Sequence, residues 1–366
     1  MKKVSKLWLG MVLVLALALL FVACAAPTPE PAPAPAPTPA PEPAPAPAPA
    51  PAPEPAKEYV IKLPHDSPVT HIVNLTAEKF AELCEQYSNG QIKVDIYPAG
   101  QLYDSKGSAQ AVLMGTTQMA MLASGKLGVD PSENLLNAPG LWTRDSYYEI
   151  CTGPAGTAFL KHLESSGLHG LGVGMNSISQ GIFSSIGPIN TPADLDGQKI
   201  RIPPAQVPEL IVGALGASPI AIPYAELIPA LERGMVDGVF TGWTSGISKG
   251  LDEILDYGVS SAIFGGSAFS MVINQNFWDS LTPELQDIIE NKVWPETAEW
   301  NFAQAEKNEV ELTAKAKEAM KDVNRIEGAD AVKTWADALM TVPADLLKES
   351  DQSAADVVIE LTGYGK

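Results

Sequence analysis

The sequence has few cysteines and histidines, and no cluster of positive charge. Its 366 residues include 3 cysteines and 4 histidines, and its 24 lysines and arginines stand against 43 aspartates and glutamates, which gives a formal net charge of −19. Because the phosphate backbone of nucleic acids requires a basic surface, we exclude nucleic acid as a partner. A disulfide between Cys84 and Cys151 is permitted outside the cytoplasm, but two residues do not establish it.

The sequence motifs of common enzymes and metal sites are also missing. The spacings His65/His71 and His162/His169 fit neither the HExxH motif nor a pair of zinc ligands. No GxSxG motif is present. The glycine-rich run that begins at Gly170 lacks the third glycine of a dinucleotide-binding fingerprint, so we interpret it as a strand end. The sequence therefore predicts no catalytic residue, no bound metal and no cofactor.

The first 24 residues have the pattern of an export signal. Lys2, Lys3 and Lys6 precede an uncharged run that ends in Phe-Val-Ala before Cys24. The small residue before Cys24 resembles a bacterial lipoprotein processing site, which implies a lipid on Cys24 and a location on the outer face of the membrane. The alternative, an uncleaved anchor helix, would tether the protein to the same face.

A linker follows the signal. Residues 25–57 are almost entirely proline and alanine, and alternating prolines hold a chain near polyproline II, which advances about 3.1 Å per residue and buries no core. We expect an extended stalk. The remaining residues, about 310, are enough for two lobes with a core each.

The stretch from Gly197 to Trp243 shows most about function. Its hydrophobic pattern alternates strand, helix, strand, helix and strand, which predicts a mostly parallel sheet with helices on its faces. Ligands of such sheets bind beyond the carboxyl ends of the strands. Arg201, Tyr224, Thr241 and Trp243 lie near these ends.

The segments IRIP, ALGASPIAIPYAEL and ALERGMVDG, in this order, resemble the DctP family, the solute-binding proteins of tripartite ATP-independent periplasmic (TRAP) transporters. The segments NGQIKVDIYPAGQL and LMGTTQMAML resemble the first lobe of the same family. The resemblance implies an α/β fold of the periplasmic-binding-protein type, with a ligand cleft between two lobes and a long helix that spans both. It also implies a TRAP membrane permease as partner.

The resemblance assigns the main ligand contact to Arg201, which pairs with a substrate carboxylate in the family. The chemistry fits, because a guanidinium offers a planar fork of donors that a carboxylate can accept. The other candidate ligand-binding residues come by position in the family's pattern: Asp66, Ser105, Ser124, Gln180, Tyr224, Thr241 and Trp243. Gln180 stands where sialic-acid-binding members have a second arginine, so we expect a neutral donor there.

Three of these assignments have alternatives. Asp66, and Asp104 beside Ser105, could cap a turn or a helix instead of contacting the ligand. Trp243 could line the cleft or fill the core.

From these observations we expect two lobes. The first comprises residues 58–178 and about 267–306, the second residues 179–266 and about 307–366, and the C-terminal helices pack on the second. The predicted function is capture of a small organic acid, without covalent change, outside the cytoplasm. Two alternatives stay open: a binding protein that serves a sensor or another transporter class, and an extracellular enzyme.

Overall fold

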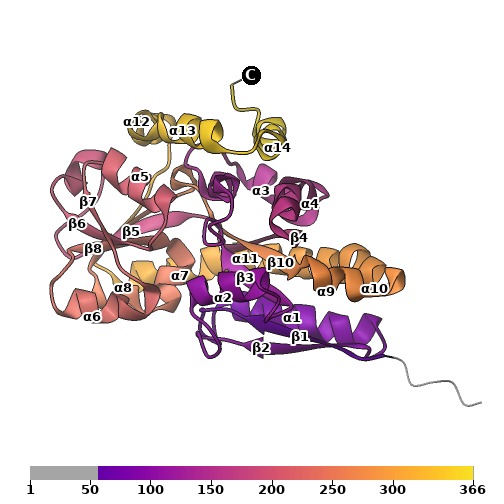
Figure 1. Ribbon diagram of the computed structural model, residues 1–366. Helices are drawn as coiled ribbons and strands as arrows, with labels where there is room; N and C mark the ends of the chain where they lie inside the picture. Colours follow the sequence, from indigo (N-terminus) through magenta and orange to yellow (C-terminus); the bar gives the residue numbers. More distant parts are fainter. Residues whose placement is uncertain (1–56, 366) are drawn as a thin grey trace, which may run out of the picture. The chain divides into compact units, whose positions relative to one another are not determined.

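The computed structural model describes residues 57–365. The predicted export signal, Cys24 and all but the last residue of the predicted linker lie outside the described residues. Within them, strands and helices alternate through most of the chain (Figure 1), which confirms the α/β prediction.

The strands form two groups. In the first group β1 pairs with β2, β10 lies between β3 and β4, and β1 contacts β3. Its members are β1 (Tyr59–Pro64), β2 (Ile92–Tyr97), β3 (Met119–Ala123), β4 (Leu168–Ser177) and β10 (Ser267–Asn274). The second group is one six-stranded sheet in the order β11-β9-β5-β8-β6-β7. Its members are β5 (Gln180–Ser184), β6 (Lys199–Ile202), β7 (Ser218–Ala221), β8 (Gly238–Gly242), β9 (Tyr257–Ser261) and β11 (Asp322–Arg325).

Helices connect these strands. The α-helices are α1 (Ile72–Tyr87), α2 (Ser105–Leu113), α3 (Arg144–Thr152), α4 (Ala155–Leu160), α5 (Gln206–Ala214), α6 (Leu227–Glu232), α7 (Trp243–Ser248), α8 (Leu251–Ile254), α9 (Gln275–Ser280), α10 (Pro283–Ile288), α11 (Trp294–Ala319), α12 (Ala329–Leu339), α13 (Val342–Glu349) and α14 (Gln352–Thr362). Short 3-10 turns include η1 (Pro131–Asn137), η2 (Lys161–Ser166), η3 (Pro192–Leu195), η4 (Tyr224–Glu226) and η5 (Ala262–Phe264).

The prediction of a mostly parallel sheet is confirmed for the stretch that suggested it, and three of the five pairings in the six-stranded sheet are parallel. β6 is parallel to β7 and to β8, but β5 runs antiparallel to β8 and β9, and β10 runs antiparallel to β3 and β4. The antiparallel strands β5 and β10 are the ones at which the chain passes from one group of strands to the other, because β5 follows β4 and β10 follows β9 without an intervening α-helix.

Glycines follow the ends of several helices. Gly115 follows α2, Gly216 follows α5 and Gly234 follows α6, with φ angles of 73°, 85° and 64°. These left-handed angles suit glycine, which has no Cβ to clash. The α2-to-β3 and α6-to-β8 segments thus match as helix, glycine and strand.

The glycine-rich run lies inside β4 and not at the end of a strand, which corrects the interpretation from the sequence. A Cβ on Gly170 would meet Leu160, one on Gly172 would overlap the Trp294 indole, and one on Gly174 would overlap the Phe269 ring. The glycines therefore let large side chains approach the strand backbone closely.

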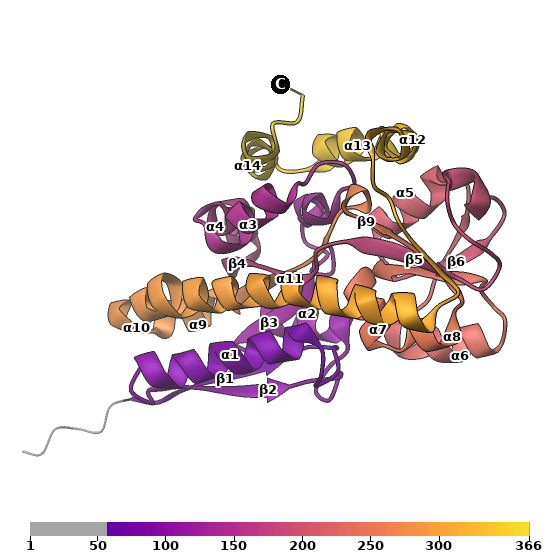
Figure 2. The ribbon, with the colours of Figure 1, turned by 180° about the vertical axis from the view of Figure 1, so that it is seen from behind.

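Helix α11 is the longest of the described helices and contacts both groups of strands (Figure 2). Its first half contacts α1, α3 and β4, and its second half contacts α7, α8 and β11, as the pairs Tyr87–Glu296 and Trp243–Thr313 illustrate. A π-helical turn at Ile289–Val293 joins α10 to α11, just before Pro295. Pro295, which lacks an N–H group, lies in the first turn of α11, where that group would have no partner within the helix.

The C-terminal helices differ from expectation. α12 contacts α5, in the predicted second lobe, but α14 contacts α3 and α4, in the predicted first lobe, and α13 contacts both η1 and α5. Asp351 is the N-cap of α14. Its backbone N–H donates to the hydroxyl of Ser132 in η1 at 2.7 Å, so α14 begins against the predicted first lobe. The apolar pattern of these helices does not specify which surface they cover.

Both described cysteines, Cys84 and Cys151, are buried and free, and burial raises the pKa of each thiol. Cys84 lies on the buried face of α1, as its helical spacing predicts. Among residues 57–365, no helix combines the length and apolar character that a bilayer crossing requires.

Candidate functional site

Arg201 lies in β6 with its side chain buried, only 1% exposed. Its neighbours Ile200 and Ile202 are buried as well, so the strand is covered on both faces. In a strand with one solvent-exposed face, the arginine side chain would have been exposed. The Nε of Arg201 donates to the carbonyl oxygen of Ile222 at 2.9 Å, while Nη2 has no partner. Burial lowers its pKa to about 10. A buried cation with an unused nitrogen fits an anion.

Tyr224 and Asp66 share the electrostatic environment of Arg201. Burial and the nearby Asp66 together raise the pKa of Tyr224 to about 12, although the charge of Arg201 opposes the shift. Tyr224 follows β7, and Asp66 follows β1 in the other group of strands. Charged groups from both groups of strands therefore act on Tyr224.

Two lysines that the sequence analysis missed belong to the same cluster. Lys126 lies in the loop after β3, and Lys249 ends α7 with its ammonium 4.1 Å from the centre of the Tyr224 ring. Burial lowers the pKa of each lysine, and the charge of Arg201 lowers both further. Lys126 stands two residues after Ser124, so its place at a strand end was a usable signal, whereas nothing in the local sequence marks Lys249.

Ser124, Gln180 and Thr241 lie at strand ends too. Ser124 is buried and its hydroxyl has no partner. Gln180 is buried, and its amide nitrogen donates to the carbonyl oxygen of Phe264 at 3.2 Å, so one of its two N–H donors is already in use. Thr241 is half-buried on β8, opposite Gly181 of β5.

Trp243 lies in the core, which contradicts its predicted place in the cleft. Its side chain is fully buried, stacks on Phe183 with ring centres 4.5 Å apart, and donates from Nε1 to Thr313 at 2.9 Å. Its indole is therefore already enclosed by protein atoms and its donor is satisfied.

Ser105 is the first residue of α2 and is half-buried. The adjacent Asp104 caps the helix by accepting from the backbone N–H of Gly107 at 2.6 Å, which is the structural alternative considered for this position.

Two buried histidines stand beside the cluster. Both ring nitrogens of His65 lack a partner, and burial lowers its pKa. His71 caps α1 by accepting from the N–H of Val73, and its Nε2 lies 3.0 Å from the hydroxyl of Ser245 in α7. Burial, together with His65, lowers the pKa of His71 to about 4. This imidazole pair is neutral at pH 7, and His71 joins the two strand groups.

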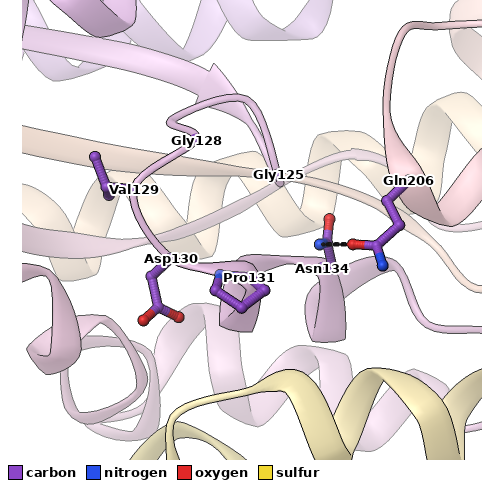
Figure 3. Close-up of a pocket in the computed structure, with 7 residues that line it drawn as sticks. All are labelled: Gly125, Gly128, Val129, Asp130, Pro131, Asn134 and Gln206. Carbon is purple, nitrogen blue, oxygen red and sulfur yellow. Dashed lines mark hydrogen bonds between the residues drawn. The ribbon is translucent and has the colours of Figure 1, made fainter.

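A separate pocket of about 260 Å³ adjoins the loop that carries Ser124 and Lys126 (Figure 3). It is lined by Gly125, Gly128, Val129, Asp130, Pro131, Asn134 and Gln206. Asn134 donates to Gln206 at 2.8 Å across it. Its lining includes no lysine or arginine, so this pocket does not suit an anion. Within residues 57–365, no group of three or more histidine, cysteine, aspartate or glutamate side chains is placed to hold a metal ion.

Comparison with known families gives one match across most of the chain. The model of the family described as DctP, bacterial extracellular solute-binding protein, family 7, matches residues 63–347. The C4-dicarboxylate-binding periplasmic protein DctP of Rhodobacter capsulatus is 30% identical over 295 residues, which cover 78% of this chain and 86% of that protein. The C4-dicarboxylate-binding protein DctB of Bacillus subtilis is 30% identical over 251 residues, covering 68% and 71%.

Solved structures share the fold. A TRAP periplasmic solute-binding protein from Desulfovibrio salexigens, with bound orotic acid, has a TM-score of 0.75 at 24% identity and covers 83% of this chain and 97% of its own. One from Sulfurospirillum deleyianum, with bound succinate, has a TM-score of 0.71 at 22% identity and covers 83% and 98%. These likenesses confirm the predicted two-lobed fold of the periplasmic-binding-protein type.

Proposed function

This chain belongs to the DctP family of bacterial extracellular solute-binding proteins, and we propose that its solute is a small organic acid whose carboxylate binds Arg201. The observation that carries the proposal is the guanidinium of Arg201, which is buried, has a free nitrogen and has no acidic partner within the described residues. A ligand carboxylate would supply the missing charge and accept the unused N–H groups.

The other contacts must come from the residues around Arg201. A charged hydrogen bond contributes roughly 1.5 to 3 kcal/mol, whereas micromolar affinity requires about 8 kcal/mol. We assign supporting contacts to Tyr224, Ser124 and Thr241, which lie at the strand ends and carry hydroxyl groups. The relatives support an acid as ligand, because two of them are named for C4-dicarboxylates and one solved structure holds succinate.

We further propose that the ligand is enclosed between two lobes, residues 58–178 with about 267–306 and residues 179–266 with about 307–366. The division of the strands into two groups supports this assignment, since each group lies within one lobe. Closure of the lobes around the ligand would produce the state that a TRAP-type permease recognises.

The proposed location is the outer face of the cell membrane, with the lipid on Cys24 as anchor. The charged start, the uncharged run and the small residue before Cys24 support it. Replacement of Cys24 by alanine should abolish incorporation of a labelled fatty acid. Labelling that persists in this variant contradicts the lipid anchor.

The test of the binding function is the melting temperature of the purified full chain with succinate and galactonate, and with their neutral amides. At 100 times its dissociation constant, a ligand that binds only the folded state adds about 2.7 kcal/mol of stability. We expect at least one carboxylate to raise the melting temperature, its amide to have little effect, and Arg201→Met to remove the response.

Arg233→Met is the matched control, because Arg233 is an exposed arginine at the end of α6. This variant should respond to the carboxylate as the unmodified chain does. A neutral amide that stabilises as strongly as its acid, or an Arg201→Met variant that still responds, would contradict the proposal.

A further inference from the structure

His71 forms a direct contact between elements of the two strand groups. It is the N-cap of α1, the helix that connects β1 with β2 in the first group. Its Nε2 lies 3.0 Å from the hydroxyl oxygen of Ser245 in α7, the helix that follows β8 in the second group. The two residues are 174 positions apart along the chain, and only 7% of His71 is exposed. The contact is therefore a buried link between distant segments.

The hydrogen bonds of His71 determine which ring nitrogen carries the hydrogen. Nδ1 accepts from the backbone N–H of Val73 at 3.3 Å, so Nδ1 has no hydrogen of its own. A neutral imidazole has one N–H group, which is then at Nε2 and donates to the hydroxyl oxygen of Ser245. One neutral ring thus caps α1 and contacts α7 at the same time.

A second proton on this ring would disrupt both contacts. The proton would go to Nδ1, where it meets the N–H of Val73, and two donors cannot form a hydrogen bond with each other. The new positive charge would also lie at the N-terminus of α1, which is the positive end of the helix dipole. Burial, together with His65, already lowers the pKa of His71 to about 4. The protonated ring must therefore leave its position, and its contact with Ser245 is lost with it.

The charged groups near His71 do not compensate a positive charge on it. His65 precedes it on the same loop and opposes its protonation. Glu78 of α1 accepts from the amide of Asn74. On the side of α7, the nearest charged residue along the helix is Lys249, one turn after Ser245, and it is a cation itself.

The other elements that pack against α1 and α7 present neutral groups at these contacts. Helix α11 places Asn301 against Thr76 of α1 and Thr313 against Trp243 of α7. Charged residues of the neighbouring elements pair elsewhere or are exposed: Lys93 of β2 with Glu58, Glu290 of the π-helical turn with His169, Glu296 of α11 with Lys79, Glu309 of α11 with Arg325, Lys315 of α11 with Asp252 and Glu253 of α8, and the exposed Asp95 of β2 and Lys292 of the π-helical turn.

We propose that the contact between His71 and Ser245 is a latch that acid releases, so that protonation of His71 lets the two strand groups move apart. The inference rests on the proposed division into two lobes, but it does not depend on the identity of the ligand. A solute held between the lobes would be retained near neutral pH and released in an acidic medium. The competing explanation is that His71 only caps α1, so that its protonation loosens this helix and leaves the strand groups in place.

The direction and the size of the effect follow from linkage. In the latched form the pKa of His71 is about 4, whereas a ring released into water returns towards the ordinary value of 6.5. The released form therefore binds the additional proton between these values, and its share grows as the pH falls. Between pH 8 and pH 5, the ratio of separated to latched molecules should rise by up to about 30-fold.

The experiment is a distance measurement between the strand groups without ligand. Spin labels are attached to Asp95→Cys in β2 and Glu232→Cys in α6, both at exposed positions, in the full chain with Cys24→Ala. The remaining cysteines, Cys84 and Cys151, are buried and do not compete for the label. Pulsed electron paramagnetic resonance then gives the distance distribution at pH 8 and at pH 5.

Four labelled proteins are compared: the otherwise unmodified chain, His71→Asn, Ser245→Ala and the control His169→Asn. His169 is a matched histidine, because it lies in β4, stacks on Trp278 and pairs with Glu290, all among elements of the first strand group.

In the unmodified chain and in His169→Asn, we expect the longer-distance population to grow at least about threefold relative to the shorter one between pH 8 and pH 5. In His71→Asn the distribution should not change between these pH values. Ser245→Ala should favour longer distances already at pH 8. Proton NMR of the four histidines should also give a higher pKa for His71 in Ser245→Ala than in the unmodified chain.

A distribution that is the same at pH 8 and pH 5 in the unmodified chain would overturn the inference and leave His71 as a helix cap. A pKa of His71 that is unchanged in Ser245→Ala would overturn it as well. A His71→Asn chain that still opens in acid would assign the movement to other groups. None of these measurements contains a ligand, so a failure to bind carboxylates would contradict the proposed function and leave this result unaffected.

Discussion

The unpaired charge of Arg201 should destabilise the protein when no ligand is bound. Burial lowers its pKa from 12.5 to about 10, which corresponds to about 3 kcal/mol against the charged form in the folded state. Removal of the charge relieves this penalty but loses the hydrogen bond to Ile222, worth about 1 kcal/mol. We therefore expect Arg201→Met to raise the free energy of unfolding of the ligand-free protein by roughly 2 kcal/mol.

Urea unfolding at pH 7 without ligand measures this change, with the exposed Arg233→Met as control, which should stay within about 0.5 kcal/mol of the unmodified chain. A clear loss of stability in Arg201→Met would mean that the arginine supports the fold in addition to the ligand.

His71 should make stability depend on pH. Its folded pKa of about 4 lies below the ordinary value of 6.5, so the unfolded chain binds the extra proton between these values. Stability therefore falls as the pH falls from 6.5 towards 4, by about 2 kcal/mol at pH 4.5. Glu133 acts with the opposite sign, because its folded pKa of about 7 is raised, and it destabilises the protein as the pH rises from 4.5 through 7.

His71→Asn isolates the histidine, because asparagine can also cap α1 but does not titrate. Between pH 7 and pH 4.5, urea unfolding should show a loss of stability about 2 kcal/mol smaller in this variant than in the unmodified chain. Equal losses in the two proteins would assign the pH dependence to other groups.

At the scale of single residues, the sequence predicts the chemistry of a site better than it predicts which side chains are buried. Arg201 could be proposed as a ligand contact because a motif and a strand end coincide at one position. The core position of Trp243 could not be predicted, since it depends on Phe183 and on Thr313, which are 60 and 70 residues away along the chain. Lys126 was missed because a single lysine after a strand is common, and only the folded chain brings it to Pro204.

The element with the tightest packing is β4, whose glycines face large side chains. A methyl group on Gly172 would overlap the indole of Trp294, at the start of α11. We expect Gly172→Ala to lower the free energy of unfolding by about 1 to 3 kcal/mol, the usual effect of overpacking. Thermal unfolding measures the loss.

Gly187→Ala is the control, because a Cβ there meets no atom within 4 Å. It should change stability by less than about 0.5 kcal/mol. A Gly172→Ala variant as stable as this control would show that α11 can move away from β4.

At the scale of elements, the hydrophobic pattern of residues 197–243 predicted the strands and helices of that stretch. The stretch from β6 to β8 agrees with its pattern, because each helix there ends at a glycine with a left-handed φ. Strand direction was predicted less well, since alternation of side chains is the same in parallel and antiparallel strands. The prediction that all C-terminal helices pack on the second lobe was wrong for α14, which packs on α3 and α4. The reason is similar, because an apolar helix face does not specify which element it contacts.

The net charge of the whole chain opposes the arrival of an anionic ligand. With a formal charge of −19, the molecule repels an anion at distances where the local field of Arg201 and the lysines is weak. The Debye length falls from about 30 Å at 0.01 M salt to about 8 Å at 0.15 M. We therefore expect the rate constant for association of a carboxylate ligand with the protein to rise by a factor of about 2 to 10 between 0.01 M and 0.15 M salt.

Stopped-flow fluorescence with added KCl measures this rate, and sucrose at equal osmolarity controls for effects unrelated to charge. A rate that falls steadily with salt would mean that the cationic cluster attracts the ligand even at long range.

Helix α11 also has a practical consequence. Its 26 residues rise by about 1.5 Å each, and its packing against elements of both strand groups keeps it one continuous rod. Spin labels at the exposed positions Ala303 and Glu318 would stay about 22 Å apart whether the lobes are open or closed. The molecule thus contains its own length standard, against which any change between a label on β2 and a label on α6 can be calibrated in the same sample.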